Sequence, residues 1–230
     1  MTSRPTILTI AIATAVVYSS WALAPWLNPE LDAVNAFASE LGADGQPNAW
    51  VFRLADVVAA IGFLTVTWLA APRTLQIIGF SRTDQAWEHL LPHLIWGCVA
   101  LLGIATIVDA TFPMSCAESQ VSHAVAVSSQ CRTPSMLIHE TASVVVGAST
   151  IGATVLSTWL FVSRQLPQRM LITALTGLHI ALTAYTGLDA FLNWPGKGLT
   201  QRGSIVALVL WWVLYVAIVT KLHQRQGERT

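Results

Sequence analysis

Charged and titratable side chains stand inside segments of the chain that are otherwise apolar. Arg53 and Asp56 are three residues apart, so they share one face of a helix and can pair. His139 and Glu140 are adjacent in another segment, and Asp109 lies near the end of a third. A carboxylate beside a histidine would hold one tautomer of the ring and favour its protonated form. In lipid such groups indicate either a functional site or a paired structural network.

Ser39, His139 and Asp109 are the residue types of a catalytic triad. A hydrolase would use Ser39 as the nucleophile and His139 as the general base, with Asp109 or Asp56 orienting the imidazole. This chemistry requires the serine hydroxyl within hydrogen-bond reach of the imidazole, a distance that the sequence leaves open. The alternative, which we favour, is that Ser39 hydrogen-bonds its local backbone.

The composition predicts a membrane protein. Hydrophobic residues make up 54% of the 230 residues and charged residues only 10%, and the mean hydropathy is +0.59. Soluble domains carry about 25% charged residues. Lys and Arg balance Asp and Glu at 12 each, so no basic excess indicates nucleic acid. The expected partner is membrane lipid, and the oligomeric state is left open.

Six stretches are long and apolar enough to span a bilayer as helices, which takes about 20 residues each. They cover residues 5–26, 49–71, 90–112, 136–162, 170–192 and 203–222. The first ends in a motif that resembles a signal-peptide cleavage site, but Pro25 would follow the cut, so we interpret it as a helix. The fold class is therefore all-α, a six-helix transmembrane bundle that forms a single domain over residues 1–230.

The distribution of basic residues predicts the orientation of the bundle. Eight lie at the termini and in the loops on one side: Arg4, Arg73, Arg82, Arg164, Arg169, Lys221, Arg225 and Arg229. The other side holds three, namely Arg132, Lys197 and Arg202. Because positive loops stay inside, both termini are predicted to be cytoplasmic.

The cysteines agree with this orientation. Cys116 and Cys131 both lie in the connection that the charge rule places outside, where disulfides persist, and we predict a bridge between them. Metal binding by this pair is the less favoured alternative, because no CxxC motif or ligand-spaced pair of histidines accompanies it. Cys98, inside the third span, is expected to be a buried apolar residue.

The ionisable residues lie at similar depths in four helices. At 1.5 Å per residue, Arg53 and Asp56 lie roughly 6–10 Å from the outer end of their helix, and the others about 5 Å. We therefore predict an outward-facing polar pocket whose ligand-binding residues are Glu40, Arg53, Asp56, Glu140 and Asp189. The same residues could instead be the polar contacts that hold helices together in lipid.

The first outer loop predicts a short amphipathic helix on the membrane surface. Its apolar residues recur at helical spacing, at Leu31, Val34, Phe37, Ala38 and Leu41. Gly42 would end the helix. Tryptophans near the span ends, Trp26, Trp50, Trp87 and Trp194, indicate an interfacial belt, whereas Trp211 and Trp212 are expected to pack inside the last helix or face lipid.

The segment Ser39-Glu40-Leu41-Gly42-Ala43, followed by Asn48 and Phe52, then Asp109 near Phe112-Pro113, and His139, resembles the bacterial membrane family catalogued as domain of unknown function 998. The resemblance implies about six helices and a Ser-Glu-Leu-Gly signature in the first outer loop. It implies no established reaction. The loop cysteines and the insertion before His139 are outside the resemblance.

Ser39, Asp109 and His139 also resemble, more loosely, parts of the zinc-dependent transmembrane hydrolases related to alkaline ceramidases. Three histidines would have to meet on one zinc ion, yet His93, His139 and His179 are expected at three depths. The same argument weighs against haem, whose two axial ligands share a level. We therefore expect no metal and no cofactor.

The preferred interpretation is a multi-pass protein of the plasma membrane, bacterial by resemblance, that binds or senses a lipid head group or small polar molecule in its outward-facing pocket. An acidic cluster beside aromatic residues would suit an amine head group. The first alternative is an intramembrane lipid hydrolase built from Ser39, His139 and Asp109. A small-molecule transporter is the second alternative, although most prolines lie at helix ends and in loops rather than near the midplane.

Overall fold

The computed structural model describes residues 3–77, 90–126, 128–192 and 194–227, and all the regular secondary structure of these residues is helical. The long helices are α1 (Arg4–Tyr18), α3 (Ala49–Ile77), α4 (Leu91–Thr111), α6 (Pro134–Ser163), α7 (Arg169–Leu192) and α8 (Lys197–Gly227). The short ones are η1 (Ser20–Leu23), α2 (Ala24–Leu27), η2 (Ala38–Gly42), η4 (Glu118–Gln120) and α5 (His123–Ala126). Within these residues, five helices are long and apolar enough to cross a membrane, and α1 with the bent segment after it makes a sixth. The predicted all-helical membrane fold is confirmed.

The first predicted span, residues 5–26, is bent rather than continuous. Arg4–Tyr18 and Ser20–Leu27 meet at 47°. The Ser19 hydroxyl donates to the carbonyl of Ala15 at 2.9 Å at this point. Side-chain bonds of this kind compete with the helical ladder, and serine pairs such as Ser19 and Ser20 are common at kinks.

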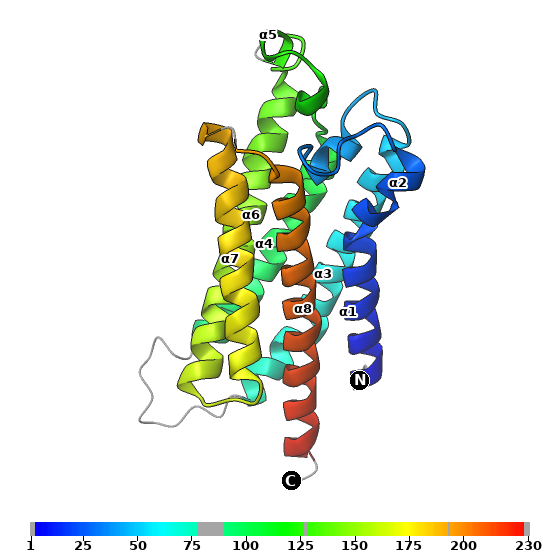
Figure 1. Cartoon of the computed structure of the whole chain (residues 1–230). Helices are drawn as coiled ribbons and strands as arrows, with labels where there is room; N and C mark the ends of the chain where they lie inside the picture. The colour runs from blue at the N-terminus through cyan, green and yellow to red at the C-terminus, as the bar shows by residue number, and fades with distance from the viewer. Residues whose placement is uncertain (1–2, 78–89, 127, 193, 228–230) are drawn as a thin grey trace.

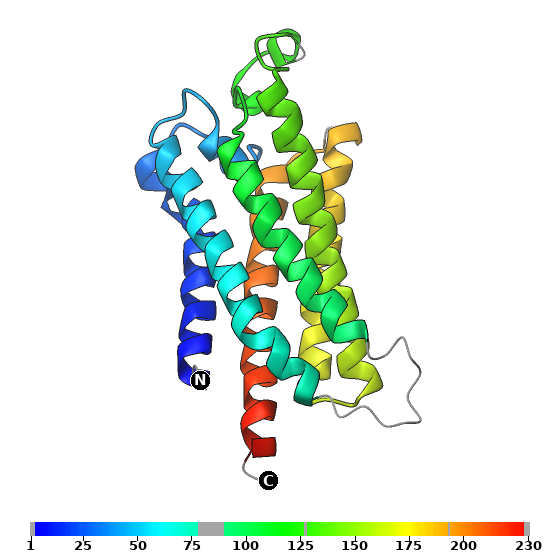
Figure 2. The ribbon, with the colours of Figure 1, turned by 180° about the vertical axis from the view of Figure 1, so that it is seen from behind.

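The long helices run side by side, and both termini lie at the same end of the bundle (Figures 1 and 2). We call this the termini end. The opposite end, which we call the loop end, carries residues 28–48, 112–126, 128–133 and 194–196. The membrane side that each end faces remains a prediction.

Aromatic rings fill the half of the bundle toward the termini end. Trp212 lies edge-on to Phe63, with ring centroids 5.0 Å apart, and Trp211 stacks on Tyr215 at 5.3 Å. Both indoles are buried. The Trp211 indole donates to Ser157 Oγ at 2.9 Å, and the Trp212 indole donates to the Ala11 carbonyl at 3.2 Å. Trp211 and Trp212 were expected either to pack inside the bundle or to face lipid, and the structure shows that they pack inside it.

Tryptophans near the span ends are exposed, as an interfacial belt requires. The exposed fractions of Trp26, Trp50 and Trp194 are 77%, 67% and 42%. These side chains would meet the interfacial region of a bilayer. Trp87 lies outside the described residues.

The first loop, residues 28–48, forms turns and the short η2 rather than the predicted helix over residues 31–41. Three of its backbone carbonyls accept hydrogen bonds from α8. Ala33 O and Ala36 O both accept from Arg202 Nη1 at 2.8 Å, and Val34 O accepts from Leu199 N at 3.1 Å. These bonds replace the helical ladder that the periodicity predicted.

The last helix begins at Lys197, six residues before the predicted start at 203. Its first two turns include Gly198 and Arg202, both buried against the first loop. A Cβ atom at Gly198 would overlap the carbonyl oxygen of Ala36. The absence of a side chain there lets the loop lie directly on the helix. We call this contact between the first loop and α8 the loop latch.

Candidate functional site

A cavity of about 950 Å³ lies in the half of the bundle toward the loop end. Each of the six long helices contributes to its wall, for example through Tyr18, Asp56, Asp109, His139, His179 and Ser204. Residues of the first loop, the 112–133 connection and the start of α8 line its outer part. A cavity of this size matches the range for small-molecule sites.

Asp109 and His139 form the best-connected polar group of this cavity. His139 Nδ1 lies 3.5 Å from Asp109 Oδ1 and 3.1 Å from the Asp109 carbonyl oxygen. Ser143 Oγ donates to the same carboxylate at 2.6 Å. Both acceptors favour the ring tautomer that carries hydrogen on Nδ1. The predicted approach of a carboxylate to His139 is therefore present in the structure.

Asp56 lines the same cavity from α3, so its carboxylate shares the cavity with that of Asp109. Among the described residues, no donor hydrogen-bonds to the Asp56 carboxylate. Two carboxylates from neighbouring helices thus meet at one cavity, and only that of Asp109 has side-chain partners. Such a pair attracts cations.

The predicted pairing of Arg53 with Asp56 is wrong. Arg53 Nη2 instead lies 2.6 Å from Asp44 Oδ1, and Nε donates to the Gly42 carbonyl at 2.6 Å. Arg53 stands in the second turn of α3, so its long side chain reaches the first loop, which offers both acceptors. Asp56 is left facing the cavity without this cation.

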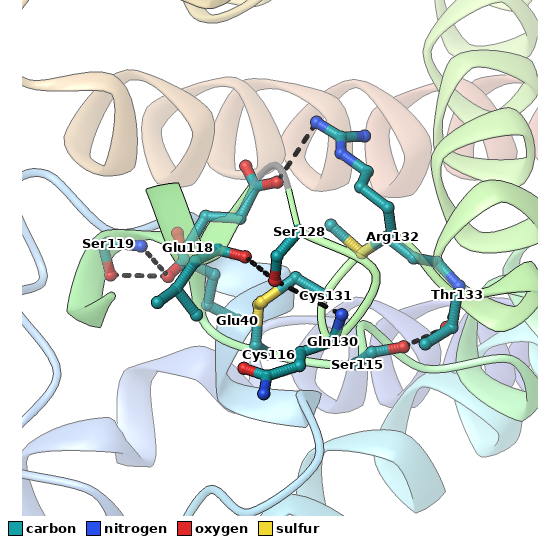
Figure 3. Close-up of a disulfide and its surroundings, with 12 residues drawn as sticks. Glu40, Ser115, Cys116, Glu118, Ser119, Ser128, Gln130, Cys131, Arg132 and Thr133 are labelled. Carbon is teal, nitrogen blue, oxygen red and sulfur yellow. Dashed lines mark hydrogen bonds and ion pairs between the residues drawn. A yellow bond between two sulfur atoms is a disulfide. The ribbon is translucent and has the colours of Figure 1, made fainter. Parts of the chain in front are cut away.

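Glu40 ties the first loop to the 112–133 connection. Its Oε1 accepts from Phe37 N at 3.0 Å, and its Oε2 accepts from Ser119 N at 3.0 Å and from Ser119 Oγ at 2.5 Å (Figure 3). The side chain is fully buried and does not line the cavity. The structure thus surrounds this predicted ligand-binding residue with protein donors.

The predicted disulfide between Cys116 and Cys131 is present, with Cα atoms 5.5 Å apart. Arg132, next to it, pairs with Glu140 and lies 3.6 Å from Glu118 (Figure 3). All three of these charged residues line the outer part of the cavity. Glu140 is thus in the cavity wall, as predicted, but with a cation beside it.

Ser39 lines the cavity together with His139. No hydrogen bond joins the two side chains in the part of the chain that the structure describes. The side chain of Asp189 lies outside the described residues. His179, deeper in the bundle, lies 3.0 Å from Thr150 Oγ1 and 3.1 Å from the Ser204 carbonyl, and so links three helices.

Sequence reasoning missed several residues that shape the site. Thr106 lines the cavity three residues before Asp109, and this helical spacing was a usable signal. Lys197 and Gln201 line it from the start of α8, which the hydropathy pattern had assigned to a loop. Gln201 Oε1 accepts from Ala38 N at 2.5 Å, next to Ser39.

In the described part of the chain, no three His, Cys, Asp or Glu side chains gather closely enough to hold a metal ion. The comparison with known families finds one matching model, over residues 11–218. The chain belongs to the family "Protein of unknown function (DUF998)". This membership agrees with the resemblance carried by the Ser39–Ala43 segment. No curated protein and no solved structure matches the chain.

Proposed function

We propose that this DUF998 protein binds a small polar ligand, or the head group of a membrane lipid, in the loop-end cavity. The observation that carries the proposal is the pair of carboxylates, Asp56 and Asp109, facing one cavity from neighbouring helices. Charges inside a membrane bundle are costly unless they are paired. A cationic group of the ligand would offset the repulsion between the two carboxylates.

The rest of the cavity wall supports a ligand that also carries an anionic group. Lys197, at the outer part of the cavity, lies over the Phe37 ring, with Nζ 4.8 Å from the centroid. The aromatic side chains of Tyr18, Trp21 and Phe52 also line the cavity. Ammonium groups bind well to aromatic faces beside carboxylates. A zwitterion such as a phosphoethanolamine head group fits this distribution of charge.

Glycerophosphoethanolamine, the soluble form of that head group, is the probe for this proposal. Asp56→Asn should weaken its binding to the purified protein by roughly tenfold or more, which corresponds to about 1.4 kcal/mol. Asp44→Asn is the matched control, because Asp44 is 57% exposed and does not line the cavity. Equal affinities of Asp56→Asn and the wild type in calorimetry would refute the proposed cation site.

A second candidate, a lipid hydrolase, is favoured by one contact: Asp109 holds Nδ1 of His139 in the cavity that Ser39 also lines. Ser39 would attack the ester or amide carbonyl, and Nε2 of His139 would take its proton. A fluorophosphonate probe should label the wild type and not Ser39→Ala or His139→Asn. Labelling that persists in Ser39→Ala would exclude Ser39 as the nucleophile.

We also propose that the loop end faces the outside of a plasma membrane. The Cys116–Cys131 disulfide lies at this end, and disulfides persist outside the cytoplasm. In a Cys98→Ser background, a membrane-impermeant maleimide should label Ala33→Cys in intact cells and leave Ser163→Cys unlabelled. Both positions are exposed, one at each end of the bundle. The reverse labelling would invert the orientation.

A further inference from the structure

The wall of the cavity between α6 and α7 is also part of the outer surface of the protein. Val144 on α6 lines the cavity and is 71% exposed, and Gly187 on α7 lines it and is exposed as well. On the opposite side, Phe52 on α3 and Thr106 on α4 line the cavity and are only 4% exposed. The cavity therefore has an opening in its side, between α6 and α7.

The contacts between α6 and α7 explain the place of this opening. Thr176 bonds to Thr158 Oγ1 at 2.8 Å and to the Thr154 carbonyl at 3.2 Å, and His179 bonds to Thr150 at 3.0 Å. Closer to the loop end than His179, no hydrogen bond joins the two helices among the described residues. The two helices lean apart toward that end in Figures 1 and 2. Polar bonds thus close the gap in one half only.

The opening lies beside the predicted spans of α6 and α7, residues 136–162 and 170–192, so we infer that it faces lipid rather than water. Val144 is ten residues after Pro134, about 15 Å along α6 at 1.5 Å per residue. Gly147 lies one turn deeper and also lines the cavity. Added Cβ atoms at Gly147 and Gly187 would meet nothing within 4 Å, so both sides of the gap have free space. A bilayer lipid would reach this gap with its acyl chains outside and its head group inward.

A buried hydroxyl oxygen that lines the cavity has no hydrogen-bond partner. Thr106 is 4% exposed and lines the cavity one helical turn from Asp109, and its Oγ1 has no hydrogen-bond partner. Tyr18 lines the same cavity. A buried hydroxyl without a partner is costly, and a donor or acceptor on a ligand would remove that cost. Thr106 and the two carboxylates thus define one polar subsite.

We propose that a lipid with an amine head group enters the cavity sideways, between α6 and α7, with its ammonium group at Asp56 and Asp109 and its acyl chains along Val144 and Gly187. This inference rests on the proposed function and names its ligand class and route. The lipid is favoured over a soluble amine because the side opening lies at the depth of the acyl chains. The acidic subsite selects the ammonium group by charge.

The test uses the full chain in phosphatidylglycerol vesicles. The probe is a phosphatidylethanolamine with a photoreactive acyl chain, and crosslinked peptides are mapped by mass spectrometry. Gly187→Leu adds a side chain at the gap, and Gly177→Leu is its control, because Gly177 is also exposed on α7 with open space around it but does not line the cavity. We expect labelling of α6 and α7, a roughly tenfold loss in Gly187→Leu, corresponding to about 1.4 kcal/mol, and wild-type labelling in Gly177→Leu.

Further measurements distinguish the role of the side opening from that of the binding site itself. Glycerophosphoethanolamine should still bind Gly187→Leu, and a phosphatidylglycerol probe with the same chain should label α6 and α7 far less. Equal labelling of the two glycine variants would overturn the lateral route, as would binding of the soluble head group without any lipid labelling. Equal labelling by the anionic lipid would overturn the amine selectivity. Failure of the wild type to bind either ethanolamine compound would overturn the proposed function itself.

Discussion

The two halves of the bundle are built in opposite ways from the same six helices. Toward the termini end, Phe63, Trp96 and Trp212 pack ring against ring, with centroids 5.0–6.2 Å apart in the pairs made by Trp212. Toward the loop end, the same helices separate around a cavity of about 950 Å³. Packed aromatic rings therefore fill one half, whereas the other half surrounds the cavity and has a smaller apolar cluster that includes Leu41, Phe52 and Met136. The difference indicates where stability and where binding reside.

This division has a physical reason in lipid. Helix association there depends on packing and on interhelical hydrogen bonds, since the bilayer is as apolar as the side chains. A half with a cavity loses packing contacts and needs other connections. At the loop end these connections include the loop latch at Arg202, the buried Glu40 carboxylate and the disulfide.

Trp212→Ala should have the largest effect on stability. The indole is fully buried among rings and bonded to the Ala11 carbonyl, and truncations of this kind cost about 3–5 kcal/mol. Trp68→Ala, at a side chain that is 81% exposed, should change stability little. The measurement is denaturant unfolding in mixed micelles. Similar small losses in both variants would show that the ring cluster is not the stable half.

Removal of the disulfide should have the second-largest effect on stability, and it should destabilise the loop end. The bridge has a sequence separation of 15, and closing such a loop is worth about 3 kcal/mol in the chain-entropy model. Cys116→Ser with Cys131→Ser should lower stability by that order and expose residues 112–133 to proteases. Cys98→Ser is the control. Unchanged proteolysis of the double variant would mean that Glu40 and the ion pairs hold this connection without the bridge.

The sequence predicted the termini-end half better than the loop end. Runs of about 20 apolar residues define spans whatever their partners, so the five long spans appeared near their predicted positions. The partner of Arg53 and the conformation of the first loop were predicted wrongly. Their contacts come from residues that are distant in sequence or that a turn of the chain brings close. Helical spacing favoured Asp56 as the partner of Arg53, whereas the loop placed Asp44 and Gly42 closer. Arg202 bonds to carbonyls 166 and 169 residues away, which no periodicity reveals.

Glu40→Gln tests how strongly the loop end depends on one buried group. The carboxylate accepts three hydrogen bonds, and an amide nitrogen in place of one oxygen would oppose a donor, at a cost of about 1–3 kcal/mol. Glu30→Gln, at an exposed position of the same loop, should be neutral. Hydrogen exchange of residues 37–43 and 115–120 provides the readout. Equal exchange in both variants would show that the latch at Arg202 suffices.

Asp32 should give the smallest effect and a pH dependence confined to the loop end. Hydrogen bonds from the Asn35 side chain and from Val34 N lower the pKa of Asp32 below its usual value. Because the pKa of Asp32 is lowered, its ionised carboxylate stabilises the folded turn fully above the ordinary pKa of aspartate, about 3.9. This stabilisation is lost as the pH falls through the lower pKa of the folded protein. The Val34 amide should therefore lose protection from hydrogen exchange on acidification, while amides around Trp212 keep theirs. In Asp32→Asn the pH-dependent step in Val34 protection should vanish, because the asparagine side chain does not titrate. If the step persists in this variant, another carboxylate controls the turn, and if amides near Trp212 respond equally, the two halves unfold together rather than separately.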